Sequence, residues 1–204
     1  RRGAAARDLR PAPWSSWLTL AVVVAAAVPL LVLSRRPASD GTFCLDKAWD
    51  VARACSYDTA WPTLPLQWLV LAGGALVVLM GGGEVVLRRM PSGEYHFLLL
   101  ASITGALVLV AARDLATAVV ALETVTLPLV AMVALSRRAR GAQAGLALFL
   151  SSVVSLAVSL YGIALLYSVT GTLHYSEISL ALTRFEHLPA IAEVGAVLVL
   201  AVFV

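Results

Sequence analysis

The chain has 204 residues, of which 60% are hydrophobic and only 13% are charged, and its formal net charge is +3. Soluble domains average about 45–50% apolar and about 25% charged residues, so this composition excludes an ordinary soluble globular domain. The small positive charge requires no nucleic-acid partner, and we interpret the arginines as topology signals instead.

Six apolar segments follow one another along the chain. Five are long enough to span a bilayer, which takes about 20 helical residues, and they lie near 15–34, 66–87, 96–112, 115–135 and 144–168. A sixth begins near 190 and is still apolar at Val204, so we expect it to start another span. Segment 15–34 has no small-residue cleavage site and is followed by four more spans, so it is not a signal peptide. The sequence therefore predicts an all-α, polytopic transmembrane helical bundle, with 1–204 forming a single membrane domain.

Basic residues indicate the orientation of these spans. If 1–14 is a cytoplasmic basic segment, the cytoplasmic side carries four Arg there, two at 88–89 and three within 137–140, nine in all. The opposite side then carries six, which agrees with the positive-inside rule. We therefore expect extracytoplasmic loops at 36–64 and 170–188.

The two cysteines, Cys44 and Cys55, both fall in the predicted loop 36–64. Extracytoplasmic thiols tend to be oxidised, and a disulfide closing a loop of this size would stabilise the fold by about 3 kcal/mol. The alternative is two unrelated free thiols. Metal binding is disfavoured, because no His lies in this loop and two sulfurs alone do not make a site.

Glu123 is the one ionisable residue deep inside a long apolar run, 115–135. A charged side chain at the bilayer centre costs roughly 2.5–3.5 kcal/mol on insertion scales, and a glutamate escapes this cost by binding a proton. A carboxyl group in apolar surroundings can therefore exchange protons near neutral pH. We predict that Glu123 transfers protons; the alternative is a neutral acid that only bonds to a neighbouring helix.

Polar groups accompany this acid on two of the predicted spans. Pro128 breaks the helical hydrogen bond to the Thr124 carbonyl, which membrane helices tolerate where other groups or water satisfy it. In the 144–168 span, Ser151, Ser155 and Ser159 repeat every four residues and form one stripe. The stripe favours close helix packing by small residues. A second function, lining water beside Glu123 together with Thr124, is compatible with it.

Motifs for bound cofactors are missing from the sequence. There is no dinucleotide fingerprint, phosphate-binding loop, nucleophile elbow or two-histidine helix motif. The three histidines, His96, His174 and His187, lie at predicted interfaces or in the 170–188 loop, where we expect them to be solvated. We therefore predict neither a cofactor-binding residue nor a metal ligand in this chain.

Several stretches resemble subunit N of the proton-pumping NADH–quinone oxidoreductase, respiratory complex I. They are 93–100 (GEYHFLLL), 112–115 (ARDL) and 122–129 (LETVTLPL), and the continuation at 143–146 (QAGL), 161–167 (YGIALLY) and 170–173 (TGTL) agrees. The resemblance is strongest over 93–175. It implies an antiporter-like fold of about fourteen helices, in which Glu123 is the fifth-helix acid that pairs with a lysine on the seventh helix.

The resemblance also implies that the chain is partial at both ends. Segment 15–34 resembles the second helix of the family, and 195–204 resembles the start of its broken seventh helix, ahead of the expected lysine. Where the family often has a lysine and an aromatic residue, this sequence has Ala147 and Leu148, and Lys47 is its only lysine.

The function implied by the resemblance is proton translocation coupled to quinone reduction, as one subunit of a translocase in a bacterial plasma membrane. Its partners would be lipid and the other membrane subunits of complex I, with NADH, FMN, iron–sulfur clusters and quinone bound elsewhere in the complex. Two alternatives are a subunit of a multi-subunit sodium/proton antiporter or membrane hydrogenase, and a structural copy that does not pump.

Overall fold

The computed structural model describes residues 13–35, 41–45, 54–59, 62–88, 90–135, 139–184 and 189–200. Its elements are α1 (Pro13–Ser34), β1 (Thr42–Leu45), β2 (Ala54–Tyr57), α2 (Thr63–Arg88), α3 (Ser92–Ala111), α4 (Leu115–Ala134), α5 (Ala139–Thr170), α6 (Tyr175–Thr183) and α7 (Ala190–Leu200). Most of the predicted basic segment 1–14, part of each predicted loop, Lys47, His187 and the tail after Leu200 lie outside the described residues.

The predicted transmembrane helices are confirmed. Helices α1 to α5 are each long and apolar enough to cross a membrane, and α7 is a shorter apolar helix. The largest difference in length is at α5, which has 32 residues and extends beyond the predicted 144–168 at both ends. The protein is therefore an all-α, polytopic membrane bundle.

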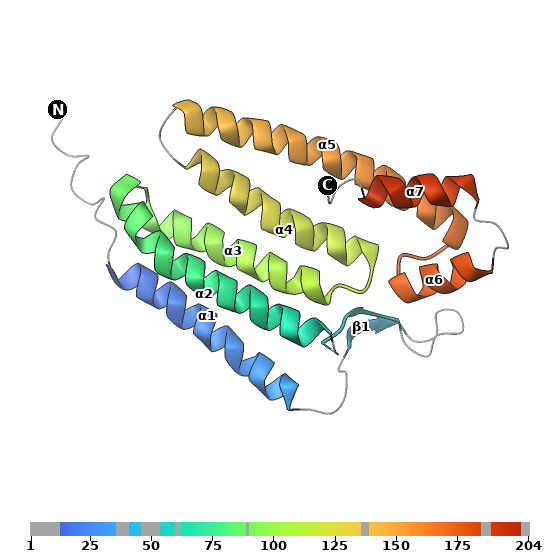
Figure 1. Ribbon diagram of the computed structural model, residues 1–204, viewed down its shortest axis with the longest axis horizontal. Helices are drawn as coiled ribbons and strands as arrows, with labels where there is room; N and C mark the ends of the chain where they lie inside the picture. Colours follow the sequence, from blue (N-terminus) through green and yellow to red (C-terminus); the bar gives the residue numbers. More distant parts are fainter. Residues whose placement is uncertain are drawn as a thin grey trace.

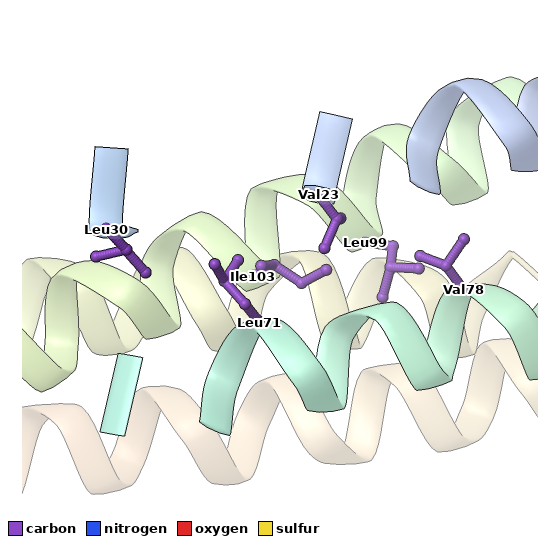
Figure 2. Close-up of a cluster of buried hydrophobic side chains, with 6 residues drawn as sticks. All are labelled: Val23, Leu30, Leu71, Val78, Leu99 and Ile103. Atoms are coloured by element: carbon purple, nitrogen blue, oxygen red, sulfur yellow. The ribbon is translucent and has the colours of Figure 1, made fainter. Parts of the chain in front are cut away.

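The long helices lie side by side in chain order, from α1 to α5, and α7 packs along α5 (Figure 1). Helix α1 also contacts α3, so the first three helices form a small group of their own. Figure 2 shows the apolar side chains at their centre, which come in pairs from each helix: Val23, Leu30, Leu71, Val78, Leu99 and Ile103. A second apolar cluster joins the start of α4 to α5, α6 and α7.

Two glycines bring α5 and α7 into close contact. A Cβ added at Gly162 would lie 2.8 Å from the carbonyl oxygen of Gly195, and one added at Gly195 would lie 3.0 Å from the Gly162 carbonyl oxygen. Without side chains at this crossing, the two backbones approach closely, as small residues allow in membrane helix pairs. The crossing holds α7 against the α5 half that is nearest the start of α4.

The predicted loop 36–64 contains an antiparallel hairpin, and α2 already begins at Thr63. In this hairpin Cys44 pairs with Cys55 in register, and the structure joins their sulfur atoms in a disulfide bond. The sequence separation is 11, so the bond closes a short loop. Closing it restricts the unfolded chain and thereby favours the folded hairpin.

We predict that this disulfide supports assembly and not proton transfer. Mass spectrometry of non-reduced peptides should find Cys44 linked to Cys55, and replacing both with Ser should destabilise the hairpin by about 3 kcal/mol. Under the proton translocation that the family resemblance implies, complexes of the double variant that do assemble should move as many protons as the unmodified complex, because the described strands Thr42–Leu45 and Ala54–Tyr57 carry no acidic side chain. Alkylation of both thiols without a reductant would rule the disulfide out.

A backbone seam connects the hairpin to the short link 112–114 between α3 and α4. The amide of Arg113 donates to the Ser56 carbonyl at 2.9 Å, and the amide of Asp58 donates to the Ala111 carbonyl at 3.1 Å. These bonds place an extended stretch of the link beside β2, like a third strand.

The same link is bonded on its other side to 173–175. The Leu115 amide donates to the Leu173 carbonyl at 3.0 Å, and the Tyr175 amide donates to the Arg113 carbonyl at 3.1 Å. The predicted loop 170–188, which joins two apolar segments, contains a short helix: α5 ends at Thr170 and α6 runs from Tyr175 to Thr183. The apolar side chains Ile178 and Leu182 of α6 pack against the second cluster, and the helical backbone puts both on the same face.

Candidate functional site

Glu123 is the ninth residue of the 20-residue helix α4 and therefore lies near the middle of this span. Its side chain is half-buried. One turn earlier on the same face, Val119 packs into the cluster formed by α5, α6 and α7. Further along α4, Ala134 lies against Gly145 of α5, where an added Cβ would come within 2.9 Å of the Ala134 Cβ. Glu123 thus lies on the α5 side of its helix.

The serine stripe of α5 passes Glu123 at the same height. Helices α4 and α5 are antiparallel, with Ala134 against Gly145 at one end and Leu115 clustered with Leu166 at the other. Counting inward from these contacts places residues near 156 opposite Glu123, because both helices rise by the same distance per residue. Exposure falls along the stripe: Ser151 is exposed, Ser155 is half-buried and Ser159 is buried.

The Glu123 carboxylate makes no hydrogen bond or ion pair within the described part of the chain. The described residues include no lysine, since the only one in the sequence is Lys47. They also contain no group of three or more His, Cys, Asp or Glu side chains that could hold a metal ion. At the height of the acid, α5 carries the hydroxyl groups of Ser155 and Ser159 together with apolar side chains such as Leu156.

Pro128 lies in a helix that stays continuous from Leu115 to Ala134. Because proline has no N–H, the Thr124 carbonyl receives no donor from its own helix. The Thr124 hydroxyl donates to the Val120 carbonyl at 2.7 Å, and the Thr126 hydroxyl reaches the Glu123 carbonyl at 3.5 Å. Both threonine hydroxyl protons are thus directed to the α4 backbone, and only their lone pairs remain for water.

Thr124 faces a different side of α4 from Glu123. It lines an open, mostly apolar cavity of about 400 Å³ between α3 and α4, and the described lining does not include Glu123. The lining residues are Thr104, Gly105, Val108, Ala116, Thr117, Val120, Ala121 and Thr124. We predicted Thr124 and the serine stripe together as water-lining. Thr124 faces the cavity toward α3, whereas the serine stripe belongs to α5.

Asp114 was not singled out from the sequence, although it caps α4. Its carboxylate accepts a 2.7 Å bond from the Thr117 amide and a 2.8 Å bond from the Thr117 hydroxyl. Burial by itself raises the pKa of this carboxyl group, but the Thr117 bonds, a Ser56 hydrogen bond and the charge of His174 outweigh burial and lower the pKa overall. The Asp-x-x-Thr spacing ahead of an apolar run is the sequence signal that could have predicted this cap.

The Asp114 cap predicts a pH dependence of stability. Its pKa is lowered in the folded protein, so its contribution is present above the unfolded value of about 3.9 and is lost as the pH falls through the folded pKa. Replacing Asp114 with Ala should destabilise the protein by about 1 kcal/mol at neutral pH. Thermal unfolding in detergent should show the loss at neutral pH and a smaller difference from the unmodified protein below about pH 4. A difference that grows with acidification would contradict this assignment.

Two histidines are buried, so their predicted solvation is wrong. His174 belongs to the backbone seam, opposite Asp114. His96 is 5% exposed, and its Nδ1 lies 2.6 Å from the Ser92 carbonyl oxygen, which can only accept. In a neutral ring Nε2 then accepts from the Ser16 hydroxyl at 3.2 Å, which ties α3 to α1. A carbonyl of its own helix α3 and a hydroxyl group of α1, and not water, satisfy the two ring nitrogens of His96.

Comparisons with known proteins identify relatives of this chain. Residues 112–204 match the family described as NADH:quinone oxidoreductase/Mrp antiporter, transmembrane. The chain is 44% identical over 174 residues to NADH-quinone oxidoreductase subunit N 2 of Streptomyces griseus, covering 85% of this chain and 31% of that protein. It is 42% identical to subunit N of Salinispora tropica, covering 65% of this chain and 25% of that protein. The chain therefore spans between a quarter and a third of the length of these relatives.

Solved structures share the same fold. A chain of respiratory complex I from Thermus thermophilus, with bound aureothin, superposes with a TM-score of 0.66 at 25% identity, covering 92% of this chain and 37% of that chain. A chain of the membrane-bound sulfane sulfur reductase, an archaeal respiratory membrane complex, superposes with a TM-score of 0.67 at 18% identity, covering 93% of this chain and 38% of that chain. The second likeness shows the fold alone.

Proposed function

Since the chain belongs to the subunit N family of NADH–quinone oxidoreductases, we propose that it takes part in proton translocation coupled to quinone reduction. The observation that carries the proposal is Glu123, a half-buried acid near the middle of an apolar span, on the side that faces α5. An acid at such a depth is a functional group by default, because the membrane makes it costly to keep.

The proposed role of Glu123 is to bind a proton and then release it. Protonation makes the side chain neutral and removes the cost of burying its charge. Release needs a nearby acceptor, and the hydroxyl groups of Ser155 and Ser159 at the same height are suited to hold a water molecule that supplies one. Close packing by the same serines remains compatible with this role.

The rest of the proposal concerns the complex around the chain. We place the redox cofactors NADH, FMN, iron–sulfur clusters and quinone in other subunits, and the other membrane subunits of complex I and lipid around this one. The chain would then act as one subunit of a translocase in a bacterial plasma membrane, with 1–14 on the cytoplasmic side, as the excess of basic residues on that side favours.

One observation favours a copy that does not pump. The described spans contain no lysine, and Ala147 and Leu148 occupy the place where the family often has a lysine and an aromatic residue. Sodium transport is the other alternative, as in the related antiporters. Counting the protons moved per electron pair separates a non-pumping copy from the main proposal. Varying the sodium concentration separates sodium transport from it.

The test is proton transport by the intact complex that contains this chain, reconstituted in sealed vesicles. Protons moved per electron pair should fall when Glu123 is replaced with Gln, and they should not depend on the sodium concentration. An assembled Gln variant that pumps normally would contradict the proposal, and a dependence on sodium would favour the antiporter alternative.

A further inference from the structure

We infer that Ser102 and Gly105 of α3 are positioning residues for Glu123, which they hold through the α4 backbone. This inference rests on the proposed function, because it assigns residues that support the same acid. Neither residue carries a charge or touches the carboxylate, and nothing in the sequence pattern distinguishes them from other small residues of the spans.

The turn of α4 that follows Glu123 is weak on its own. Pro128 supplies no N–H, so the Thr124 carbonyl loses its helical donor, and the proline ring crowds the same carbonyl. A helix with such a break bends or loosens unless neighbouring groups stabilise the freed turn. The direction of the Glu123 side chain depends on this turn, because Thr124 and Val125 follow it directly in the chain.

Ser102 stabilises that turn from the neighbouring helix. Its hydroxyl donates to the Val125 carbonyl at 3.2 Å. Val125 is two residues after Glu123 and three before Pro128, so the bond reaches the backbone between the acid and the break. A serine or threonine hydroxyl within a helix can bond to a carbonyl of its own helix, as Thr104 does with the Leu100 carbonyl at 2.9 Å. Ser102 instead crosses to α4.

Gly105 lets α3 come close enough for this bond. A Cβ added at Gly105 would lie 2.8 Å from the Thr124 carbonyl carbon and 2.8 Å from the Val125 nitrogen, both of them backbone atoms. Ser102 and Gly105 are three residues apart and therefore share one face of α3. The two residues thus meet the α4 backbone at Val125, and Gly105 meets it at Thr124 as well.

This contact leaves the Glu123 side chain free. Val125 is two residues further along the helix and therefore points about 200° away from Glu123. Helix α3 holds the backbone on one side, and the carboxylate is directed to α5 on the other. A fixed backbone with a free side chain suits an acid that must exchange protons with one particular set of groups, because the geometry of transfer is set in advance.

The test uses the intact complex that contains this chain, in sealed vesicles, with the variants Ser102→Ala, Ser102→Thr and Thr104→Val. The first readout is the number of protons moved per electron pair. The part of this number that is lost in Glu123→Gln is called the Glu123-dependent share. A second readout is the infrared difference band of the Glu123 carboxyl group, identified as the band that Glu123→Gln lacks. A role confined to folding would not move this band in complexes that assemble.

We expect Ser102→Ala to reduce the Glu123-dependent share roughly twofold or more, the effect of losing one hydrogen bond of ordinary net strength, and to shift the carboxyl band. Ser102→Thr keeps the hydroxyl and should restore both readouts. Thr104→Val, which removes a hydroxyl bonded within α3, should match the unmodified complex. If Ser102→Ala fails to assemble, Ser102→Cys, with its weaker donor, should shift the band in the same direction.

Two outcomes overturn this inference, and neither affects the proposed function. One is an unshifted band and normal pumping in an assembled Ser102→Ala or Ser102→Cys variant, while Glu123→Gln still abolishes its share. The other is a shift of the Glu123 carboxyl band in Thr104→Val that is as large as the shift in Ser102→Ala. If Glu123→Gln itself pumps normally, the proposed function fails first, and the positioning role fails with it.

Discussion

Replacing Glu123 with Gln should slow proton transfer through this subunit by roughly a hundredfold or more, which is the usual size of the effect when a proton-transferring group is lost. Glutamine keeps the size and the hydrogen-bonding capacity of the side chain but cannot bind and release a proton. The variant should assemble normally, because an uncharged amide is easier to place in an apolar helix than a carboxylate. The measurement is the number of protons moved per electron pair in sealed vesicles.

Two further variants separate titration from geometry. Glu123→Asp keeps a group that titrates but shortens its reach by one methylene, so it should retain part of the pumping. Glu94→Gln makes the same chemical change at an exposed position in the first turn of α3 and should leave pumping unchanged. If Glu94→Gln lowered pumping as much as Glu123→Gln, loss of any carboxylate would explain the result, and the assignment of Glu123 would fail.

Replacing Gly105 with Ala should destabilise the bundle. The added methyl group would meet the α4 backbone at Thr124 and Val125 within 2.8 Å, and a backbone cannot move aside as a flexible side chain can. Overpacking of this kind costs about 1–3 kcal/mol. We expect a lower yield of assembled subunit and a lower unfolding temperature in detergent.

Gly73→Ala is the matched control for this prediction. It also replaces a mid-helix glycine, but an added Cβ there meets nothing within 4 Å. Alanine is the better helix former by up to about 1 kcal/mol, so this variant should be neutral or slightly more stable. Equal losses at Gly73 and Gly105 would show that helix packing at Gly105 is not the cause.

The spans could be predicted from the sequence because hydropathy over twenty residues is a strong signal that depends on no tertiary contact. The helix ends could not be predicted as well. Helix α5 begins near Arg140 and Gln143, polar residues that favour a helix as readily as a loop once they leave the hydrocarbon. Glu123 was identified for the same reason as the spans, since one acid in an apolar run is visible without a structure.

The residues that support the acid could not be predicted. Ser102 and Thr104 are both hydroxylated residues of one apolar helix, yet one bonds to α4 and the other to α3 itself. Which of these happens depends on how closely the two helices approach, and that is decided by Gly105 and by packing along the whole interface. The burial of His96 likewise depends on Ser16, eighty residues earlier in the chain.

The backbone seam gives α4 one fixed end. Leu115 is bonded to the 173–175 stretch, and the link just before it is bonded to the hairpin that the disulfide closes. A tilt of α4 that keeps these seam bonds pivots near Leu115. Glu123 is about 12 Å from this pivot along the helix and Ala134 about 28 Å. The same rotation displaces Ala134 more than twice as far as Glu123, so movement at the acid is small and the larger excursion falls at the Gly145 contact.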